Sequence, residues 1–556
     1  MAVMESSSGL VRIGRGVALA ALLAAVAVAF ADSSIVVLAL PDLLRRFDVS
    51  IAGVSWVVTA YNLSLAVVAL VYTRTRLASL PAARATQLGA LVFLGASLGC
   101  AVSSSVWLLV GLRVLQGAGA ALLLVGALPL IRALAGTPQR GTALWAGAGV
   151  FGAVLGPALG GALTDVYSWR AVFLAQVPVA ALALVAALGG VGAARRSDLV
   201  PLERTTGRRR HAASLALGLA SAALVGLLFL AVVQLIDVWR LTPLAAAGVV
   251  SVLPIATFLA QPLAGRLESA AATGAILVAA GLAGMGFLPA RNVLWVIAAL
   301  AVAGVGLGLL LPGLTQRVLA DAGPSTAGAA HTVWIRHAGL VAGILLLTPL
   351  LTTDLTSAAQ SAKLRGIAVV LDAPVSIGTK ARLAVDVAPL LVRPARKQLP
   401  DFESTLRPQH DPALTGIGRE LDQVVEATIT RGFRRSYLLA AVLGLLALVP
   451  LAVLRGGDAP RRSPRAAVVA LAVATALIGA ELARGAQAFG ARPRLQPACA
   501  SSAAAPASGT DAQVQRLVLE GLDVVACRLH ENREQLLLGT AAWGYRWVHR
   551  LHLPFG

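Results

Sequence analysis

Charged residues are scarce in this chain of 556 residues. Asp, Glu, Lys and Arg make up 13% of it and hydrophobic residues 58%, with a mean hydropathy of +0.81. Soluble domains carry about 25% charged residues, so this composition excludes an ordinary soluble protein. The apolar runs are continuous and about 20 residues long, the length that an α-helix needs to cross a bilayer, and they lack the alternation of a β-barrel. We therefore predict an all-α polytopic membrane protein.

Cysteine is also rare. Only Cys100, Cys499 and Cys527 are present, which excludes a cysteine-rich metal module. The sequence shows no metal-ligand cluster, phosphate-binding Gly-Lys loop or nucleophile elbow, the motifs of metal, nucleotide and hydrolase chemistry. We expect no enzymatic activity, no cofactor and no metal. If the C-terminal tail lies outside the cell, Cys499 and Cys527 could form a disulfide; two unpaired thiols are the alternative.

Acidic residues are outnumbered, since 26 Asp and Glu stand against 46 Lys and Arg and give a net charge of +20. Such an excess can indicate nucleic-acid binding, but here the arginines lie mainly in short loops between apolar runs. Every second loop is strongly basic, above all 195–211, whereas arginines of the other loops mostly have an Asp nearby. Because basic loops stay in the cytoplasm, we predict a plasma-membrane protein with a cytoplasmic N-terminus and no nucleic-acid partner.

The apolar runs predict thirteen membrane helices, of which the last is short and carries Glu481. They lie at about 17–40, 53–72, 86–104, 106–131, 140–163, 169–192, 213–236, 243–263, 272–290, 292–319, 327–351, 436–455 and 465–483. The basic stretch after the sixth helix divides them as two parallel six-helix repeats would be divided.

The predicted organisation follows from these spans. We expect a six-helix bundle over 1–192, a basic cytoplasmic linker over 193–212, and a second six-helix bundle formed by 213–351 and 436–455. The insert 352–435 should lie outside the cytoplasm, as a small partly helical module or an ordered loop that could bind a partner in the envelope. After the thirteenth span, 484–556 should form a linker and an amphipathic helix over about 511–547, also outside.

The stretch Ala25–Pro41, "AVAVAFADSSIVVLALP", allows two interpretations. Arginines precede its apolar run and Ala29-Phe30-Ala31 fits a signal-peptidase site. Cleavage there would destroy the first helix of an evenly spaced six-plus-six arrangement. We therefore expect the stretch to stay in the first membrane helix, where a carboxylate such as Asp32 is costly and suggests a functional role.

Two charges are predicted at similar depth in the membrane. Asp32 lies about eight residues, roughly 12 Å, from the outer end of its helix, and Arg113 about seven residues, roughly 10 Å, from the outer end of the fourth helix. A buried carboxylate and guanidinium would relieve each other's desolvation, and a carboxylate tuned by a cation suits proton exchange. The alternatives are a structural ion pair or two side chains that reach outward to water.

The fifth predicted helix carries glycines on one face. Gly149, Gly152, Gly156 and Gly160 recur at intervals of three or four, which lets another helix approach closely, and Pro157 removes a backbone donor. Ordinary small-residue packing gives the same pattern, so spacing alone does not decide between a functional and a structural role.

Several stretches resemble motifs of one transporter family, the major facilitator superfamily, and especially its drug:proton antiporter branch. "GAVLGPALGGALTDVYSWRAVFLAQVP" (152–178) is similar to the helix-5 antiporter motif, "RVLQGAGAA" (113–121) to the helix-4 motif and "ADSSIVVLALPDL" (31–43) to the helix-1 motif. "WVVTAYNLSLAVV" (56–68) resembles helix 2, "WIRHAGLVAGILLL" (334–347) resembles helix 11, and "TPLAAAGVVSVLP" (242–254) resembles a stretch of the second half. Together these motifs cover about 20–350 and 425–455.

The resemblance implies a major facilitator fold of two six-helix bundles, with alternating access around a central cavity. It assigns proton coupling to Asp32 and Arg113, and the antiporter motif to Gly152, Gly156, Pro157, Gly160 and Gly161. One family motif is degenerate: the loop between helices 2 and 3, "TRLASLPAARATQLG", keeps Arg76 and Arg84 but has Ser79 in place of the usual Asp.

The sequence thus predicts a secondary transporter, a proton-coupled exporter of amphipathic or hydrophobic small molecules such as drug-like compounds or envelope lipids. Small-molecule substrate, protons and membrane lipids are its expected partners. The alternative is a transport-inactive scaffold or receptor that acts through its outer insert and tail, which the altered loop would favour. Polar residues inside the spans are candidates for the cavity, namely Tyr61, Asn62, Gln116, Gln176, Gln234, His331, Arg336 and His337.

Overall fold

The computed structural model describes residues 2–189, 207–267, 269–288, 291–322, 326–380, 382–383, 399, 401–406, 412–455 and 510–540, with the single residues 472, 476, 495 and 499. Twelve helices of this part are long and apolar enough to cross a membrane. No strand occurs in it. The predicted thirteenth span (465–483) and most of the basic linker (193–206) lie outside the described residues.

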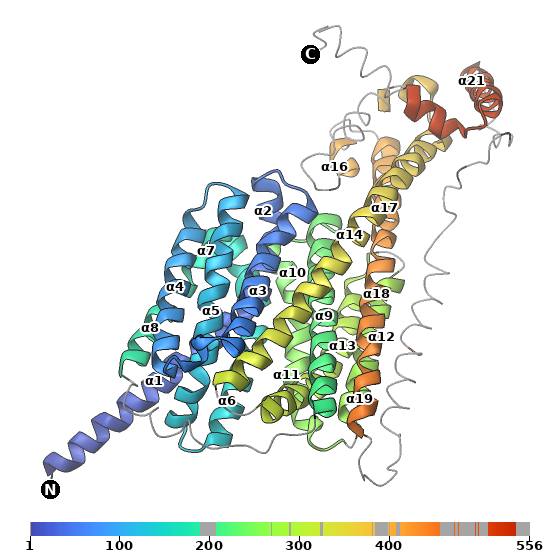
Figure 1. Cartoon of the computed structure of the whole chain (residues 1–556). Helices are drawn as coiled ribbons and strands as arrows, with labels where there is room; N and C mark the ends of the chain where they lie inside the picture. Colours follow the sequence, from blue (N-terminus) through green and yellow to red (C-terminus); the bar gives the residue numbers. More distant parts are fainter. Residues whose placement is uncertain are drawn as a thin grey trace.

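The first six spans form one bundle, drawn in blue and cyan in Figure 1. Their elements are α1 (Ala2–Ile35), η1 (Val36–Ala39), α2 (Leu40–Arg46), α3 (Ile51–Arg74), η2 (Arg76–Ser79), α4 (Ala82–Val102), α5 (Val106–Leu134), α6 (Pro138–Val166), α7 (Trp169–Leu174) and α8 (Gln176–Gly189). Side-chain oxygens of Ser50, Ser105 and Thr137 cap α3, α5 and α6 by accepting from backbone amides of the first turn.

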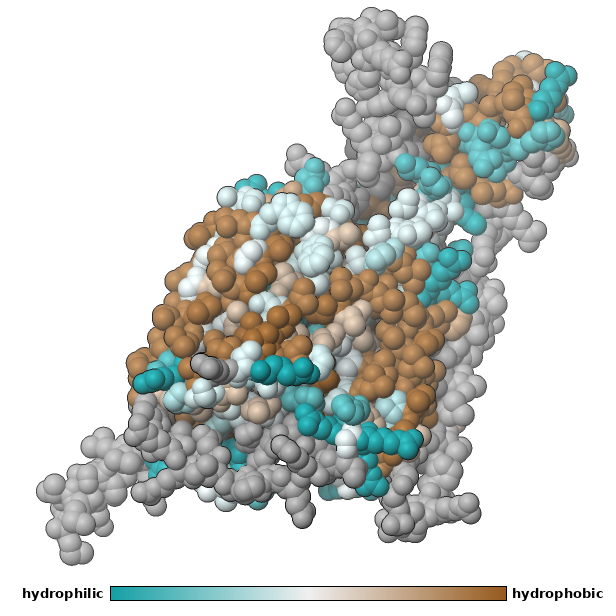
Figure 2. Space-filling model, viewed as in Figure 1, coloured by the Kyte–Doolittle hydropathy of each residue, from teal (hydrophilic) through white to brown (hydrophobic). Residues whose placement is uncertain are grey.

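The second six spans form the other bundle, drawn in green to orange. Their elements are α9 (Gly207–Val233), the π-helical η4 (Gln234–Val238), α10 (Pro243–Val250), α11 (Val252–Ala264), α12 (Ala270–Phe287), α13 (Val293–Ala322), α14 (Thr326–Asp372), α17 (Pro412–Gly432), α18 (Arg434–Leu446) and α19 (Leu448–Arg455). The two bundles meet where α14 packs on α3 and α5, and where α10 and α11 pack on α6. Apolar residues cover much of the face of both bundles that Figure 2 shows, as contact with lipid requires.

The helix-5 glycines bring α6 against α1. A Cβ atom added at Gly152 would overlap the carbonyl oxygen of Ala27, and one added at Gly160 would overlap the carbonyl oxygen of Ile35. Gly161 instead faces α10 of the second bundle, because a Cβ there would overlap the side chain of Ala247. The glycine face is therefore a site of close helix approach, within the first bundle and across to the second.

The insert between the last two spans is helical over most of its described part. α14 is 47 residues long and continues without interruption past the apolar span. α17 runs back beside it into α18, so the two helices project from the bundle as one extension (Figure 1). The short helix α16 (Phe402–Leu406) packs on α17. The helix continues because residues 352–372 lack proline and glycine up to Gly366, even though their hydropathy falls.

Polar contacts fix the extension to the second bundle. Arg240, after η4, donates to the carbonyl oxygen of Leu399 at 3.2 Å and to Asp422 Oδ1 at 2.9 Å, and its Nη1 lies 3.8 Å from Asp401 Oδ2. Trp239 Nε1 donates to Thr430 Oγ1 at 3.0 Å. Burial acts to raise the pKa of Asp401, but the hydrogen bond from the Ser404 amide and the charge of Arg240 lower it overall.

The tail packs on the extension, and the single amphipathic helix expected over 511–547 is wrong. Helix α21 spans Thr510–Arg528, and a second helical segment begins at Arg533 after a turn in which His530 has a φ of 55°. The turn interrupts the helix because His530 occupies the left-handed region. Arg533 pairs with Asp372 at the end of α14 at 2.6 Å, and a disulfide joins Cys499 to Cys527.

We predict that a methyl group at Gly152 destabilises the protein while one at Gly147 of the same helix does not. A Cβ at Gly152 meets backbone atoms of α1, whereas a Cβ at Gly147 has no heavy atom within 4 Å. Overpacking costs roughly 1–3 kcal/mol, so Gly152→Ala should melt several degrees lower and Gly147→Ala at the wild-type temperature, measured by scanning fluorimetry in detergent. Equal melting temperatures would contradict the close approach of α1 and α6.

We also predict that Arg240→Ala loosens the extension. Hydrogen exchange of α16 and α17 should become several-fold faster. Arg291→Ala removes one long ion pair, in which the exposed Arg291 lies 3.7 Å from Glu426, and should change the exchange little. Since the pKa of Asp401 is lowered in the folded protein, its contribution is present above its ordinary value of 3.8 and fades as the pH falls below it. Unchanged exchange in Arg240→Ala would show that the contacts of Arg240 are not what holds the extension.

Candidate functional site

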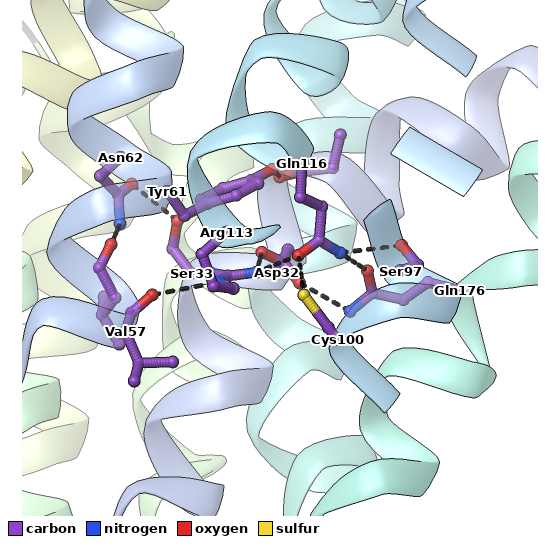
Figure 3. Close-up of polar contacts among 12 residues, drawn as sticks. Asp32, Ser33, Val57, Tyr61, Asn62, Ser97, Cys100, Arg113, Gln116 and Gln176 are labelled. Carbon is purple, nitrogen blue, oxygen red and sulfur yellow. Dashed lines mark hydrogen bonds and ion pairs between the residues drawn. The ribbon is translucent and has the colours of Figure 1, made fainter. Parts of the chain in front are cut away.

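Asp32 and Arg113 form an ion pair in the middle of the first bundle. Arg113 Nη1 donates to Asp32 Oδ2, and both side chains are 0% exposed (Figure 3). Asp32 projects from α1 and Arg113 from α5, the helices whose opposite directions place the two residues at similar depth. A charge so deeply buried is tolerable only with a partner, so each residue depends on the other.

Two glutamines close a ring of hydrogen bonds around the pair. Gln116, three residues after Arg113 on the same face of α5, accepts from Arg113 Nη1 at 2.7 Å and donates to Gln176 Oε1 at 2.8 Å. Gln176, at the start of α8, donates in turn to Asp32 Oδ1 at 2.6 Å. Ser97 Oγ of α4 also accepts from Gln116, at 2.8 Å. Both carboxylate oxygens of Asp32 are thereby held by donors.

Helix α3 encloses the guanidinium on its remaining side. A Cβ at Gly117 of α5 would overlap the carbonyl oxygen of Tyr61, so this glycine lets α3 approach closely. The Tyr61 ring lies 4.2 Å from Arg113 Cζ, and Arg113 Nε donates to the carbonyl oxygen of Val57 at 2.9 Å. Arg113 Nη2 is buried and has no hydrogen-bond partner in the described part of the chain. The cation is therefore neutralised by Asp32 alone but shielded by an aromatic face.

A polar bridge connects this region to the second bundle. Asn62 Oδ1 accepts from Ser33 Oγ at 2.8 Å and lies 2.7 Å from His337 Nδ1 of α14. Since the amide oxygen can only accept, Nδ1 of His337 is the donor in this arrangement. The bridge joins the residue next to Asp32 to the helix that carries Arg336.

A cavity of about 280 Å³ lies between the bundles. The first bundle contributes wall residues from α1 and α6, and the second from α9, α11, α13 and α14. Most wall residues are apolar, including Leu224, Leu253 and Leu340, and the polar ones include Gln261 and Arg336. Phe30 packs edge to face on Trp145 with a centroid distance of 5.5 Å, and both rings line the cavity. Such a mostly apolar pocket with few polar groups suits an amphipathic ligand.

The structure separates the candidate cavity residues from one another. Arg336 lines the cavity, whereas Tyr61 and Gln116 surround the ion pair and Asn62 and His337 form the bridge. His331 lies near the start of α14, where its Nε2 is 3.1 Å from Ser214 Oγ. Gln234 lies in η4, and its Oε1 accepts from Tyr437 at 2.9 Å inside the second bundle. Neither His331 nor Gln234 is among the wall residues of this cavity.

Several residues of the site escaped prediction from the sequence. Ser97 contributes to the hydrogen-bond ring, and the Cys100 thiol lies 3.7 Å from Gln116 Oε1, but Ser and Cys are common in membrane helices and gave no signal. Gln261 and Trp145 line the cavity. A polar residue near the end of an apolar run could have indicated Gln261, whereas nothing in the sequence distinguishes Trp145 from a packing residue.

Residues 22–346 match the family model described as Major Facilitator Superfamily. The multidrug resistance protein Stp of Mycobacterium tuberculosis is 36% identical over 159 residues, 28% of this chain and 29% of that protein. A lincomycin resistance protein of Streptomyces lincolnensis is 38% identical over 159 residues, 28% of this chain and 33% of that protein. The drug efflux pump JefA of Mycobacterium tuberculosis is 33% identical over 172 residues, 29% of this chain and 32% of that protein. The aligned part thus spans about a third or less of these relatives.

The fold is also similar to a solved structure. A bacterial homologue of the human lysosomal transporter Spinster, crystallised inward-facing and unoccupied, superimposes with a TM-score of 0.52 at 17% identity. The match covers 80% of this chain and 99% of that one. At this identity, the similarity concerns the arrangement of the helices only.

We predict that the Asp32 and Arg113 charges stabilise the bundle only as a pair. Asp32→Asn or Arg113→Gln alone should lower the free energy of unfolding by about 3–5 kcal/mol, because each leaves a buried unpaired charge. The double variant should lose clearly less than the sum of the two, as measured by melting temperatures in a double-mutant cycle. Asp42→Asn, which breaks the half-exposed pair with Arg45, serves as the control and should change little. Additive losses in the double variant would contradict mutual dependence.

Proposed function

Because this chain belongs to the major facilitator superfamily, we propose that it is a proton-coupled exporter of amphipathic or hydrophobic small molecules. Family membership makes it a multi-pass membrane transporter and not an enzyme. The observation that carries the finer proposal is the buried Asp32–Arg113 pair with its ring of donors, since a carboxylate in such a place can bind and release a proton. The names of the drug-resistance relatives support the direction of transport.

Helix α1 is the element that would connect proton and substrate. Phe30 and Ser34 are four residues apart and both line the cavity, whereas Asp32 between them points into the first bundle toward Arg113. Residues i and i+4 share a helix face and i+2 lies on the other side, so one helix carries both functions. A rotation or shift of α1 would change the wall of the cavity and the surroundings of Asp32 together.

Protonation of Asp32 would remove the charge that neutralises Arg113. The guanidinium has one unpartnered nitrogen and no second acid within the described network, so the neutral carboxyl would leave it uncompensated in a fully buried site. The cost of this uncompensated charge would be relieved only if α1 or α5 moved and placed Arg113 in another environment. The contact between Asn62 and His337 would pass such a movement to the second bundle.

We further propose that the protein lies in the plasma membrane with a cytoplasmic N-terminus, and that its extension and tail lie outside. The support is the distribution of arginines among the loops. The extension and helix α21 of the tail are on the opposite side of the bundles from the N-terminus (Figure 1). Under the proposed orientation, the Cys499–Cys527 disulfide lies in an oxidising compartment.

One observation favours the alternative of a transport-inactive scaffold. The loop between α3 and α4 lacks its family acid, and no described acidic side chain forms an ion pair with the exposed Arg84 at its end. A scaffold, however, would have little use for a fully buried ion pair beside a cavity. We therefore retain this alternative only as an outcome of the test below.

The test is proton movement in vesicles that contain the purified protein. Addition of an amphipathic substrate should release protons in the wild type, and Asp32→Asn should abolish this release because the amide cannot bind a proton at neutral pH. Asp32→Glu should keep part of it, and Asp42→Asn, an acid outside the network, should keep all of it. A wild type without substrate-dependent proton movement for any compound of a broad screen would support the scaffold instead.

A further inference from the structure

The cavity between the bundles carries charge of one sign only. Among the wall residues, all of which are described, Arg336 is the only charged one. Its guanidinium stacks on the ring of Phe30 at 4.7 Å and forms no ion pair with any described acidic side chain. Asp32, two residues from Phe30, faces away from the cavity and is already bound to Arg113. A substrate in this cavity therefore meets a positive group and no negative one.

The wall of the cavity also contains a hydrogen-bond donor, on Gln261, without an acceptor in the described part of the chain. The Nε2 atom of Gln261 on α11 is buried and has no hydrogen-bond partner within the described residues. A buried donor without an acceptor costs free energy, so such groups usually have a partner in the functional state. An acceptor brought by the substrate would satisfy Gln261, and an anionic oxygen would satisfy Arg336 as well.

Polar and apolar wall residues lie at different positions along α11 and α14. Gln261 is near the end of α11 and Leu253 near its start; Thr332 is near the start of α14 and Leu340 two turns further on. Adjacent membrane helices run in opposite directions, so both orders place the polar groups toward the end of the bundle where α9 and α14 begin. Gln261 and Thr332 thus lie toward one end of the cavity and Leu253 and Leu340 toward the other, with Arg336 midway between Thr332 and Leu340 along α14.

We propose that the substrate is an amphiphile with one anionic head group, a carboxylate or a phosphate ester, held by Arg336 and Gln261 with its apolar tail among the leucines. This inference rests on the proposed export function and specifies its substrate. Arg suits the head group because its planar fork donates two parallel hydrogen bonds to such oxygens, and its stacking on Phe30 fixes the plane. A cationic amphiphile would instead bring a like charge to Arg336.

The sign of the substrate's charge determines how transport responds to the membrane potential. If one anion leaves for each proton that enters, two positive charges move inward per cycle, whereas exchange of a monovalent cation for a proton moves none. A membrane potential that is negative inside would therefore drive export in two ways, because it favours both the entry of the proton and the exit of the anion. Transport should depend on the potential even without a pH gradient.

The experiment compares amphiphiles that share a chain and differ in head group. Dodecanoate, dodecyl phosphate and dodecyltrimethylammonium are titrated onto the full chain in nanodiscs of zwitterionic lipid, with empty discs as the background. We expect both anions to bind at least tenfold more tightly than the cation. Arg336→Gln should weaken the anions about tenfold or more and leave the cation unchanged, and Arg336→Lys should lie between. A loss for one anion only identifies whether carboxylate or phosphate is the preferred head group.

Two further variants control this comparison. Arg266→Gln removes an exposed arginine at the same end of the bundle that is not in the cavity wall, so it should leave all three affinities unchanged. Gln261→Leu should weaken the anions by a smaller factor, which keeps the test valid if Arg336→Gln fails to fold. In vesicles, dodecanoate transport should respond to an imposed potassium diffusion potential.

The outcomes separate this inference from the export function. Equal or tighter binding of dodecyltrimethylammonium, or an unchanged preference in Arg336→Gln and Gln261→Leu, overturns the anionic substrate. Asp32-dependent export of a cationic compound would do the same while leaving proton-coupled export intact. Absence of proton movement with every amphiphile would instead remove the export function, and the inference with it.

Discussion

A single buried ion pair constrains the whole first bundle. Asp32 and Arg113 are fully enclosed, and neither charge is tolerable in a membrane without the other. Their enclosure requires donors from α5 and α8, an aromatic face and a carbonyl from α3, and a hydroxyl from α4. Five helices of the bundle thus have their mutual positions fixed by one pair. Any change of its protonation acts on all of them.

Close approach of helices is the second constraint, and it explains the glycines. Gly117 lets α3 reach Arg113, while Gly152, Gly156 and Gly160 let α6 lie against α1 beside Asp32. Because α6 also lines the cavity and Gly161 contacts α10, this face connects the ion pair, the cavity and the second bundle. The glycine pattern therefore serves close packing, and under the proposed mechanism the same contacts would transmit a movement of α1 to the neighbouring helices.

Much of the fold could be predicted because a membrane span is determined by the length and hydropathy of one continuous run of residues. Twelve of the thirteen predicted spans correspond to helices long and apolar enough to cross a membrane, and the thirteenth lies outside the described residues. The similar depth of Asp32 and Arg113 in antiparallel helices indicated their pairing. The extension was not predictable from hydropathy, since α14 stays helical after the apolar run of its membrane span ends at Leu351. Gln234 shows a second limit of prediction from the sequence. Its polarity within a membrane span indicates that it has a hydrogen-bond partner, but does not tell whether that partner is Tyr437 or a substrate. Long-range side-chain pairing needs the packed bundle.

The separation of the acid from the cavity restricts the mechanism. In the simplest exchange, proton and substrate compete for one carboxylate, which suits a cationic substrate that the carboxylate attracts. Here Asp32 points away from a wall whose only charge is Arg336, so direct competition would require Asp32 to leave Arg113 and cross to the other face of α1. Coupling through movement of α1 avoids this, because Phe30, which supports Arg336, is on the same helix as Asp32. Protonation of Asp32 would then move Phe30 and with it the position of Arg336. An anionic substrate could be released in this way without ever contacting the proton site.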